Sequence, residues 1–207
     1  MCDNHFLISF IILGIMISLY LCILAIQNRI ECWTNSYSSN SSNSKYSTFF
    51  NTQGYHKILP NLYLGNIDSA GNKRFIKDQK IKVIINCTKS IPNYFQFDKD
   101  FSDLEYYRIP VDDSLLDEDI ESMAQSLSQY VKIINNALLQ NKPVLVHCYA
   151  GRQRSACLIA AYLIYKYDYS IDQAYKYIIS KRKEAFHYGK SYNFHKSLLN
   201  YIQQIKK

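Results

Sequence analysis

Blocks of apolar and polar residues alternate along the chain after about residue 55, and their lengths and periods are those of strands and helices. Short runs rich in β-branched and aromatic residues predict strands at 61–66, 82–88, 105–111 and 144–148. Longer stretches with a helical spacing of apolar residues predict helices at 69–80, 120–140, 155–167, 171–181 and 191–205. Because strands and helices interleave, the pattern predicts an α/β domain with a central, mostly parallel sheet flanked by helices.

Polar residues mark where some of these helices begin and end. Asp117 and Asp119 lie just before the stretch 120–140 and are candidates to cap its first turn. The tripeptide 141–143, which ends in proline, stops the same helix before the next strand. A turn at 168–170 separates the two helices that follow, so each predicted element has a defined end.

The first part of the chain has a different pattern. After a short tail at 1–5, residues 6–26 carry no charge, and a helix of this length spans about 31 Å, enough to cross the core of a bilayer. We therefore expect an N-terminal transmembrane helix that acts as a signal anchor. The other interpretation is a cleaved signal peptide, but the apolar run is long for one and lacks a basic start.

The segment 27–52 connects this helix to the rest of the chain. It is dominated by Ser and Asn and cannot bury enough apolar surface to fold alone, so we expect a flexible linker. The remaining residues, 53–207, are enough for one globular domain. Arg29, partly offset by Glu31, gives a slight positive bias after the helix, which predicts a single-pass membrane protein with this domain in the cytoplasm.

Charge and cysteine content argue against several classes of protein. The formal net charge of +7 would suit an anionic partner, but most lysines are scattered, so we expect no nucleic acid partner. Basic residues are densest at 180–190, which is either an anion-binding segment or a solvated helix end. The six cysteines form no C-x-x-C pair and are too sparse for a disulfide scaffold, which argues against a zinc site and favours a reducing compartment.

The stretch VHCYAGRQRS at 146–155 contains the candidate catalytic and anion-binding residues. It lies between a predicted central strand and a predicted helix, where ligands bind in open α/β sheets. The backbone N–H groups of 149–154 can converge on an anion there, and Gly151 permits the tight turn. The same setting favours the thiolate of Cys148 as a nucleophile. Spacing alone also leaves open a buried cysteine followed by chance by Arg154.

Three neighbours of Cys148 have roles that fit phosphoryl transfer. Arg154 offers a planar fork of donors that can hold two oxygens of a phosphoryl group. Ser155 can donate a hydrogen bond to the sulfur and ease its departure in a second step. His147, at the end of the strand, is expected to orient the loop rather than to act as a base.

The motif His147-Cys148-x5-Arg154-Ser155, with Gly151 in the middle, resembles the signature of cysteine-dependent protein tyrosine phosphatases. Further stretches resemble their dual-specificity branch in the same order: ILPNLYLGN at 58–66, VIINCT and PNYF within 83–95, YRIPVDDS at 107–114, and 154–178. The resemblance covers about residues 55–205 and implies the phosphotyrosine phosphatase-like α/β fold. It also assigns phosphate binding to the loop residues Tyr149, Ala150, Gly151, Arg152, Gln153 and Arg154.

The resemblance further implies a reaction and a general acid. The acid of the family follows the I-P-V strand, and the matching position is Asp113, with Asp112 as the neighbour that could be confused with it. Such an acid protonates the leaving oxygen and then activates water against a phosphocysteine. The implied activity is hydrolysis of phosphotyrosine and phosphoserine or phosphothreonine in proteins, with no metal and no cofactor.

Departures from the family pattern keep two other functions open. Gln153 replaces the usual Ser or Thr, and Arg152 adds a cation that resembles the loops of phospholipid-directed relatives, whereas Tyr149 occupies one of their basic positions. The main alternative is therefore hydrolysis of a phosphoinositide or another anionic lipid phosphate. The second is a membrane-tethered scaffold that binds phosphorylated partners with little activity. Near the C-terminus, Ser197 stands where the family often has Gln.

Two further cysteines lie in predicted core elements. Cys87 ends the strand next to the predicted phosphate loop, and one hypothesis is that it forms a reversible disulfide with Cys148 under oxidation. The other interpretation is a small buried apolar residue. Cys157 falls in the first turns of an apolar helix and is predicted to be part of the core.

Overall fold

The computed structural model describes residues 54–114, 116–187 and 194–205. The predicted tail at 1–5, the predicted transmembrane helix at 6–26, the linker at 27–52 and the boundary of the domain at 52–53 all lie outside these residues. Among the helices that the structure does describe, none combines the length and the apolar character that crossing a membrane requires.

Five strands form the central sheet, and they are β1 (Tyr55–Leu59), β2 (Leu62–Gly65), β3 (Val83–Asn86), β4 (Glu105–Arg108) and β5 (Val144–His147). Their order in the sheet is β1-β2-β5-β3-β4. The pairs β2–β5, β5–β3 and β3–β4 are parallel, and β1 pairs antiparallel with β2 at the edge. The predicted mostly parallel sheet is therefore confirmed, with β5 at its centre.

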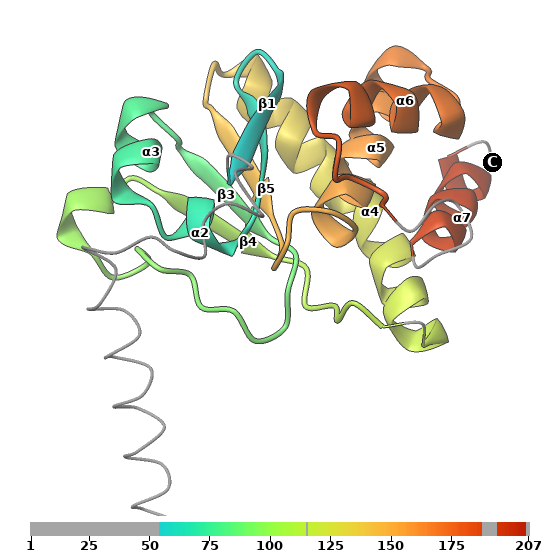
Figure 1. The fold of residues 1–207 in the computed structure, drawn as a ribbon, viewed down its shortest axis with the longest axis horizontal. Coiled ribbons are helices and arrows are strands. Elements are labelled where there is room, and N and C mark those ends of the chain that lie inside the picture. The colour runs from blue at the N-terminus through green and yellow to red at the C-terminus, as the bar shows by residue number, and fades with distance from the viewer. Residues whose placement is uncertain (1–53, 115, 188–193, 206–207) are drawn as a thin grey trace, which may run out of the picture. The chain divides into compact units, whose positions relative to one another are not determined.

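Helices cover both faces of this sheet (Figure 1). One face carries the long helices α4 (Asp117–Leu139), α5 (Arg154–Tyr167), α6 (Ile171–Lys181) and α7 (His195–Ile205). The other face carries the short helices α2 (Ile67–Ala70) and α3 (Lys73–Asp78) and the 3-10 turn η1 (Lys99–Phe101). The domain is a three-layer α/β/α arrangement, as the interleaved pattern predicts.

The alternation of side chains along the strands divides the core between these two faces. Val83 and Ile85 pack under the long helices, whereas Ile84 between them packs against the short helices. In β5, Leu145 likewise faces the short helices while its two neighbours face the long ones. Successive side chains of a strand point to opposite faces, so strands that are apolar throughout need cover on both sides.

The first elements differ from the prediction in two ways. The strand predicted at 61–66 is confirmed as β2, but the pattern did not reveal β1 before it, and Asn61 turns the chain between the two strands with a positive φ of 62°. The single helix predicted at 69–80 is two short helices. Gly71 ends α2, and the side chain of Asn72 accepts a hydrogen bond from the backbone of Phe75 to start α3. A side-chain cap in the middle of an apolar pattern therefore interrupts the helix.

Other element ends also differ from the prediction. The strand predicted at 105–111 stops at Arg108, because Pro110 has no N–H to donate to a sheet. Asp117 and Asp119 are not caps of α4, since both lie inside its first turn and the N-cap residue, Leu116, makes no side-chain cap. The helix predicted at 191–205 is described from His195 as α7, and 191–193 lie outside the described residues.

Candidate active site

The loop after β5 places Cys148 at the N-terminal end of α5. The sulfur of Cys148 is buried, with 1% of the residue exposed, and it accepts a hydrogen bond of 3.2 Å from Ser155 Oγ in the first turn of the helix. Gly151 has a φ of +64°, and a Cβ at this position would lie 2.5 Å from the carbonyl oxygen of Gly65. The loop can therefore turn this tightly only with glycine at 151.

The carbonyl groups of this loop are bound from outside it. Tyr149 O accepts from the N–H of Ile67, and Arg152 O accepts from the N–H of Phe186. Ala150 O and Gly151 O both accept from Arg182. The loop N–H groups, by contrast, donate to no backbone carbonyl within the part of the chain that the structure describes. With the carbonyls held away, these N–H groups are available to an anion above the helix N-terminus.

Arg154 connects the loop to the segment after β4. Its Nη1 donates to the carbonyl of Val111 at 3.2 Å, and its Nη2 lies 3.8 Å from Oδ2 of Asp113. Its Nε is buried and has no hydrogen-bond partner among the described residues. An unpartnered buried donor of a guanidinium is costly unless a ligand accepts from it, so this atom points to a bound anion.

The two candidate acids after β4 are held differently. Asp113 faces Arg154 and therefore Cys148's loop. Asp112 instead forms an exposed ion pair with Lys89, with 3.3 Å between Oδ2 and Nζ. The structure thus brings Asp113, rather than Asp112, to the mouth of the loop.

Arg182 is a residue of this site that the sequence pattern did not reveal. The segment 180–190 was open to interpretation as a solvated helix end, but Arg182 is only 3% exposed. Its Nε donates to Gly151 O at 2.8 Å, its Nη2 to Ala150 O at 3.0 Å, and its Nη1 lies 2.9 Å from Nδ1 of His56. The available signal was its spacing of four residues from Ile178, which continues the buried face of α6.

His147 is buried at the end of β5 and is held in its neutral form. Burial lowers the pKa of His147 to about 4, and the positive charges of Arg108 and Arg154 act in the same direction. Its Nδ1 lies 3.4 Å from the carbonyl oxygen of Cys148. A neutral ring that contacts the loop backbone is compatible with orienting the loop, and this role of His147 stays a prediction.

The other two cysteines of the described domain, Cys87 and Cys157, are free and buried. Cys87 and Cys148 belong to the same buried cluster, and burial raises the pKa of Cys87 well above its ordinary value, with the nearby Cys148 adding to the effect. Burial also raises the pKa of Cys157, whose sulfur contacts the carbonyl oxygen of Phe194 at 3.6 Å. The prediction that Cys157 belongs to the core is confirmed, whereas the redox role of Cys87 stays a hypothesis.

The residues that depart from the family pattern differ in their exposure to solvent. Tyr149 is 62% exposed, so its ring stands at the surface beside Cys148. Gln153 is buried, and its Nε2 has no hydrogen-bond partner among the described residues. Arg152 lies close enough to Arg182 for the two positive charges to interact.

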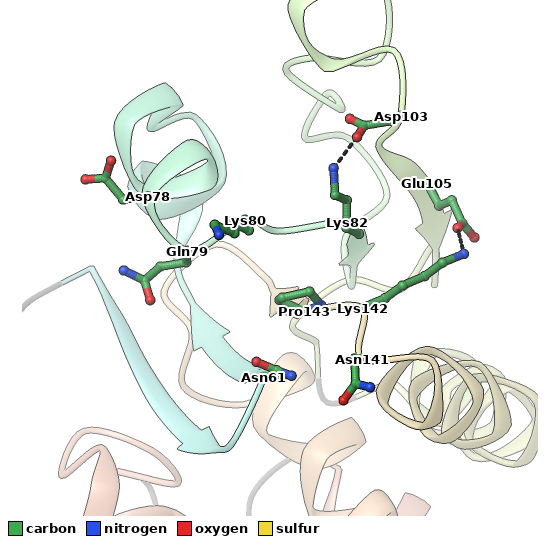
Figure 2. A pocket seen from close by; sticks show the side chains of 10 residues that line it. All are labelled: Asn61, Asp78, Gln79, Lys80, Lys82, Asp103, Glu105, Asn141, Lys142 and Pro143. Atoms are coloured by element: carbon green, nitrogen blue, oxygen red, sulfur yellow. Dashed lines mark hydrogen bonds and ion pairs between the residues drawn. The ribbon is translucent and has the colours of Figure 1, made fainter.

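A cavity of about 680 Å³ is lined by ten residues, none of which belongs to the loop of Cys148 (Figure 2). Several of its lining residues directly precede strands. The cavity is therefore at the N-terminal ends of the parallel strands, whereas Cys148 follows the C-terminal end of β5. Lys82 and Lys142 in its wall are paired with Asp103 and Glu105. Within residues 54–114, 116–187 and 194–205, no group of three or more His, Cys, Asp or Glu side chains is placed to hold a metal ion.

A buried cysteine at the end of the central strand, a loop with free N–H groups and an arginine at the following helix start are the features of cysteine-dependent phosphatases. The sequence matches the family "Dual specificity phosphatase, catalytic domain" over residues 62–204. The chain therefore belongs to the dual specificity phosphatase family.

Curated relatives agree with this assignment. The chain is 33% identical to human dual specificity protein phosphatase 9 over 150 residues, which are 72% of this chain and 36% of that protein. It is 34% identical to human dual specificity protein phosphatase 16 over 154 residues, which are 74% of this chain and 21% of that protein. The match thus spans only about a third or less of the length of these relatives.

Solved structures share the fold. DUSP15 superposes with a TM-score of 0.62 at 26% identity, over 75% of this chain and 92% of that one. Human DUSP28 gives 0.63 at 22% identity, over 75% of this chain and 97% of that one. A structure of PTPMT1 in complex with PI(5)P gives 0.59 at 20% identity, over 74% of this chain and 98% of that one. At these last two identities the likeness concerns the fold alone.

Proposed function

We propose that the protein hydrolyses phosphotyrosine and phosphoserine or phosphothreonine in protein substrates through a phosphocysteine intermediate. The observation that carries the proposal is the arrangement of Cys148, Arg154 and Asp113 around one loop, in which the buried Nε of Arg154 has no partner among the described residues. Membership of the dual specificity phosphatase family supports the same reaction.

The mechanism follows from the position of each group. The Cys148 thiolate attacks phosphorus in line, and the bond to the leaving oxygen breaks as Asp113 transfers a proton to that oxygen. Arg154 and the loop N–H groups stabilise the charge that spreads over the phosphoryl oxygens. Water, deprotonated by the Asp113 carboxylate, then attacks the phosphocysteine. The Ser155 hydroxyl stabilises the departing sulfur, and inorganic phosphate leaves.

A lipid phosphate is the second candidate substrate. Arg152 adds a cation beside the loop, and PTPMT1, which shares the fold, has been solved in complex with PI(5)P.

We also propose that residues 6–26 anchor the protein in a membrane and that the domain faces the cytoplasm. The uncharged length of this segment supports anchoring, and Arg29 after it supports the orientation. Extraction of membranes at alkaline pH should leave the full chain in the membrane pellet. Protease added to sealed vesicles should digest the domain, and protection of the domain inside the vesicles would contradict the cytoplasmic orientation.

A substrate panel tests the proposed reaction. The full chain, purified in detergent, would be given a phosphotyrosine peptide, a phosphothreonine peptide and vesicles that contain phosphoinositides, and released phosphate would be measured. We expect hydrolysis of both peptides that persists with a chelator, stops with vanadate and is absent from Cys148→Ser. Hydrolysis of lipids alone would establish the second candidate. Binding of phosphopeptides without hydrolysis would favour a scaffold.

A further inference from the structure

Asp119 is a buried carboxylate that the proposed mechanism does not use. It lies in the first turn of α4 and is only 6% exposed, whereas the side chain of Asp117, in the same turn, is 82% exposed. A carboxylate rarely becomes this buried unless donors around it replace water. The contacts of Asp119 therefore decide what the residue does.

These donors come from the loop that carries the candidate acid. Oδ1 of Asp119 accepts from the backbone N–H of Asp112 at 3.0 Å, and Oδ2 accepts from the hydroxyl of Ser114 at 2.6 Å. The two bonded residues are the immediate neighbours of Asp113 on either side. One carboxylate thus fixes the backbone before Asp113 and the side chain after it.

Lys89 reinforces this arrangement from the segment after β3. Its Nζ lies 3.5 Å from Oδ1 of Asp119 and 3.3 Å from Oδ2 of Asp112. The hydrogen bond from Ser114 and the other donors around it hold the pKa of Asp119 below its ordinary value, so the carboxylate stays ionised. Asp119 therefore combines a charge interaction with hydrogen bonds to the acid loop.

The loop at 148–154, called the catalytic loop from here on, binds the other side of the segment at 111–114. Arg154 donates to Val111 O at 3.2 Å and lies 3.8 Å from Asp113. The segment is thus bound at Val111 by the catalytic loop and at Asp112 and Ser114 by α4. Between these attachment points, Asp113 projects toward the place where a phosphoryl group would bind.

We propose that Asp119 is a positioning residue that holds Asp113 where it can protonate the leaving oxygen. This inference rests on the proposed phosphatase function. A general acid must reach the leaving atom within hydrogen-bond distance, and a displaced loop loses that contact without affecting attack by Cys148. Asp113 also acts on the water of the second step, which is common to all substrates, so the two steps must be separated. Loss of Asp119 should lower kcat/KM, which reports the steps up to release of the leaving group, only for those substrates whose leaving group needs a proton.

Two aryl phosphates separate this role from a purely structural one. Phenyl phosphate releases a phenolate with a pKa of about 10, close to that of tyrosine, and depends on the acid. 4-Nitrophenyl phosphate releases a stabilised nitrophenolate that leaves without a proton. For the full chain with Asp119→Ala we expect kcat/KM on phenyl phosphate to fall about tenfold to a hundredfold, part of the acid's usual contribution. On 4-nitrophenyl phosphate we expect a change of less than about threefold.

Matched variants make the outcome decisive. Asp119→Asn keeps an acceptor for the Asp112 N–H but loses the charge beside Lys89, so its selective loss should be smaller. It also decides the test if Asp119→Ala does not fold, which thermal unfolding would show. Asp117→Asn, in the same helical turn but exposed and paired with Lys196, should behave as the unmodified protein.

The possible results distinguish this inference from the function on which it rests. A loss on phenyl phosphate that exceeds the loss on 4-nitrophenyl phosphate supports the inference. An equal loss on both substrates, or no loss, in an Asp119→Asn variant that folds would overturn it while leaving the phosphatase function intact. If the unmodified protein hydrolysed neither substrate, the proposed function would fail, and this inference with it.

Discussion

Ser155 Oγ donates a hydrogen bond to Cys148 Sγ across 3.2 Å, and both residues are buried. The contact joins the first turn of α5 to the end of the central strand. A hydroxyl donor stabilises a sulfur that carries negative charge, which the proposed mechanism requires of Cys148 before attack and again when it leaves the phosphorylated intermediate.

Replacement of Ser155 by alanine should therefore slow breakdown of the phosphocysteine. A hydrogen bond to a charged group contributes about 1.5–3 kcal/mol, so we expect steady-state turnover of 4-nitrophenyl phosphate to fall about tenfold to a hundredfold. Stopped-flow measurement should show a burst of nitrophenolate before the slow phase. An unchanged steady-state rate would contradict this role for Ser155.

Asp113 and Asp112 should respond very differently to removal of their charge. Asp113→Asn should lower kcat on phenyl phosphate by about a hundredfold or more, since the leaving phenolate loses its proton donor. Asp112→Asn removes only an exposed ion pair with Lys89. Exposed pairs contribute little, so kcat should change by less than about threefold. Steady-state kinetics on both variants check this. The reverse order would identify Asp112 as the acid.

Arg182 should determine how well the loop binds an anion. Arg182→Met removes the donors to the carbonyls of Ala150 and Gly151 and leaves them unsatisfied, so the loop should lose its shape. We expect the affinity for vanadate to fall about tenfold or more, measured by inhibition of 4-nitrophenyl phosphate hydrolysis. Lys181→Met, at the preceding exposed residue, is the control. Reduced thermal stability with unchanged vanadate affinity would show that Arg182 acts on the fold alone.

His147 should make the domain less stable in acid. Its pKa is about 4 in the folded protein against an ordinary 6.5, so the unfolded chain binds the proton first as the pH falls. Stability is therefore lost as the pH decreases from about 6.5 to 4, by up to about 3 kcal/mol. Urea unfolding at pH 7, 6 and 5 should show this slope. The slope should be smaller in His147→Asn, and equal slopes in the two proteins would contradict the assignment.

Oxidation experiments can test whether a disulfide with Cys87 protects Cys148. Mild peroxide converts the Cys148 thiolate to a sulfenic acid, and the Cys87 thiol can then form a disulfide with release of water. We expect mass spectrometry to detect a Cys87–Cys148 peptide, and activity to return with dithiothreitol. In Cys87→Ala, peroxide should cause a loss that dithiothreitol does not reverse. Absence of the linked peptide would leave Cys87 as a core residue.

Local patterns were enough to predict much of the fold and the central loop. The interleaved apolar runs predicted a mostly parallel sheet covered by helices, and the spacing from Cys148 to Arg154 predicted a loop between the central strand and a helix. These features depend on residues that are close in sequence, so their periods and turns can be recognised without knowing what surrounds them.

Local patterns could not predict the contacts that are made between residues distant in sequence. Arg182 contacts a loop about thirty residues before it, and the acid loop is held by Asp119 together with Lys89, which comes from another strand end. In the sequence Arg182 resembles a solvated basic residue, and Asp119 a helix cap. Charged side chains have no fixed preference for surface or interior until specific donors or acceptors surround them.

The sequence by itself therefore determined the class of fold, which follows from the local period of apolar residues, and the family, which follows from several motifs that resemble it in the same order. Only the tertiary structure decided that Asp113 rather than Asp112 faces Arg154. It also decided that the loop carbonyls are held from outside by Arg182 and other residues. The reason is physical: the burial and hydrogen bonding of a polar group depend on every element packed around it, and packing brings those elements together only in the folded chain.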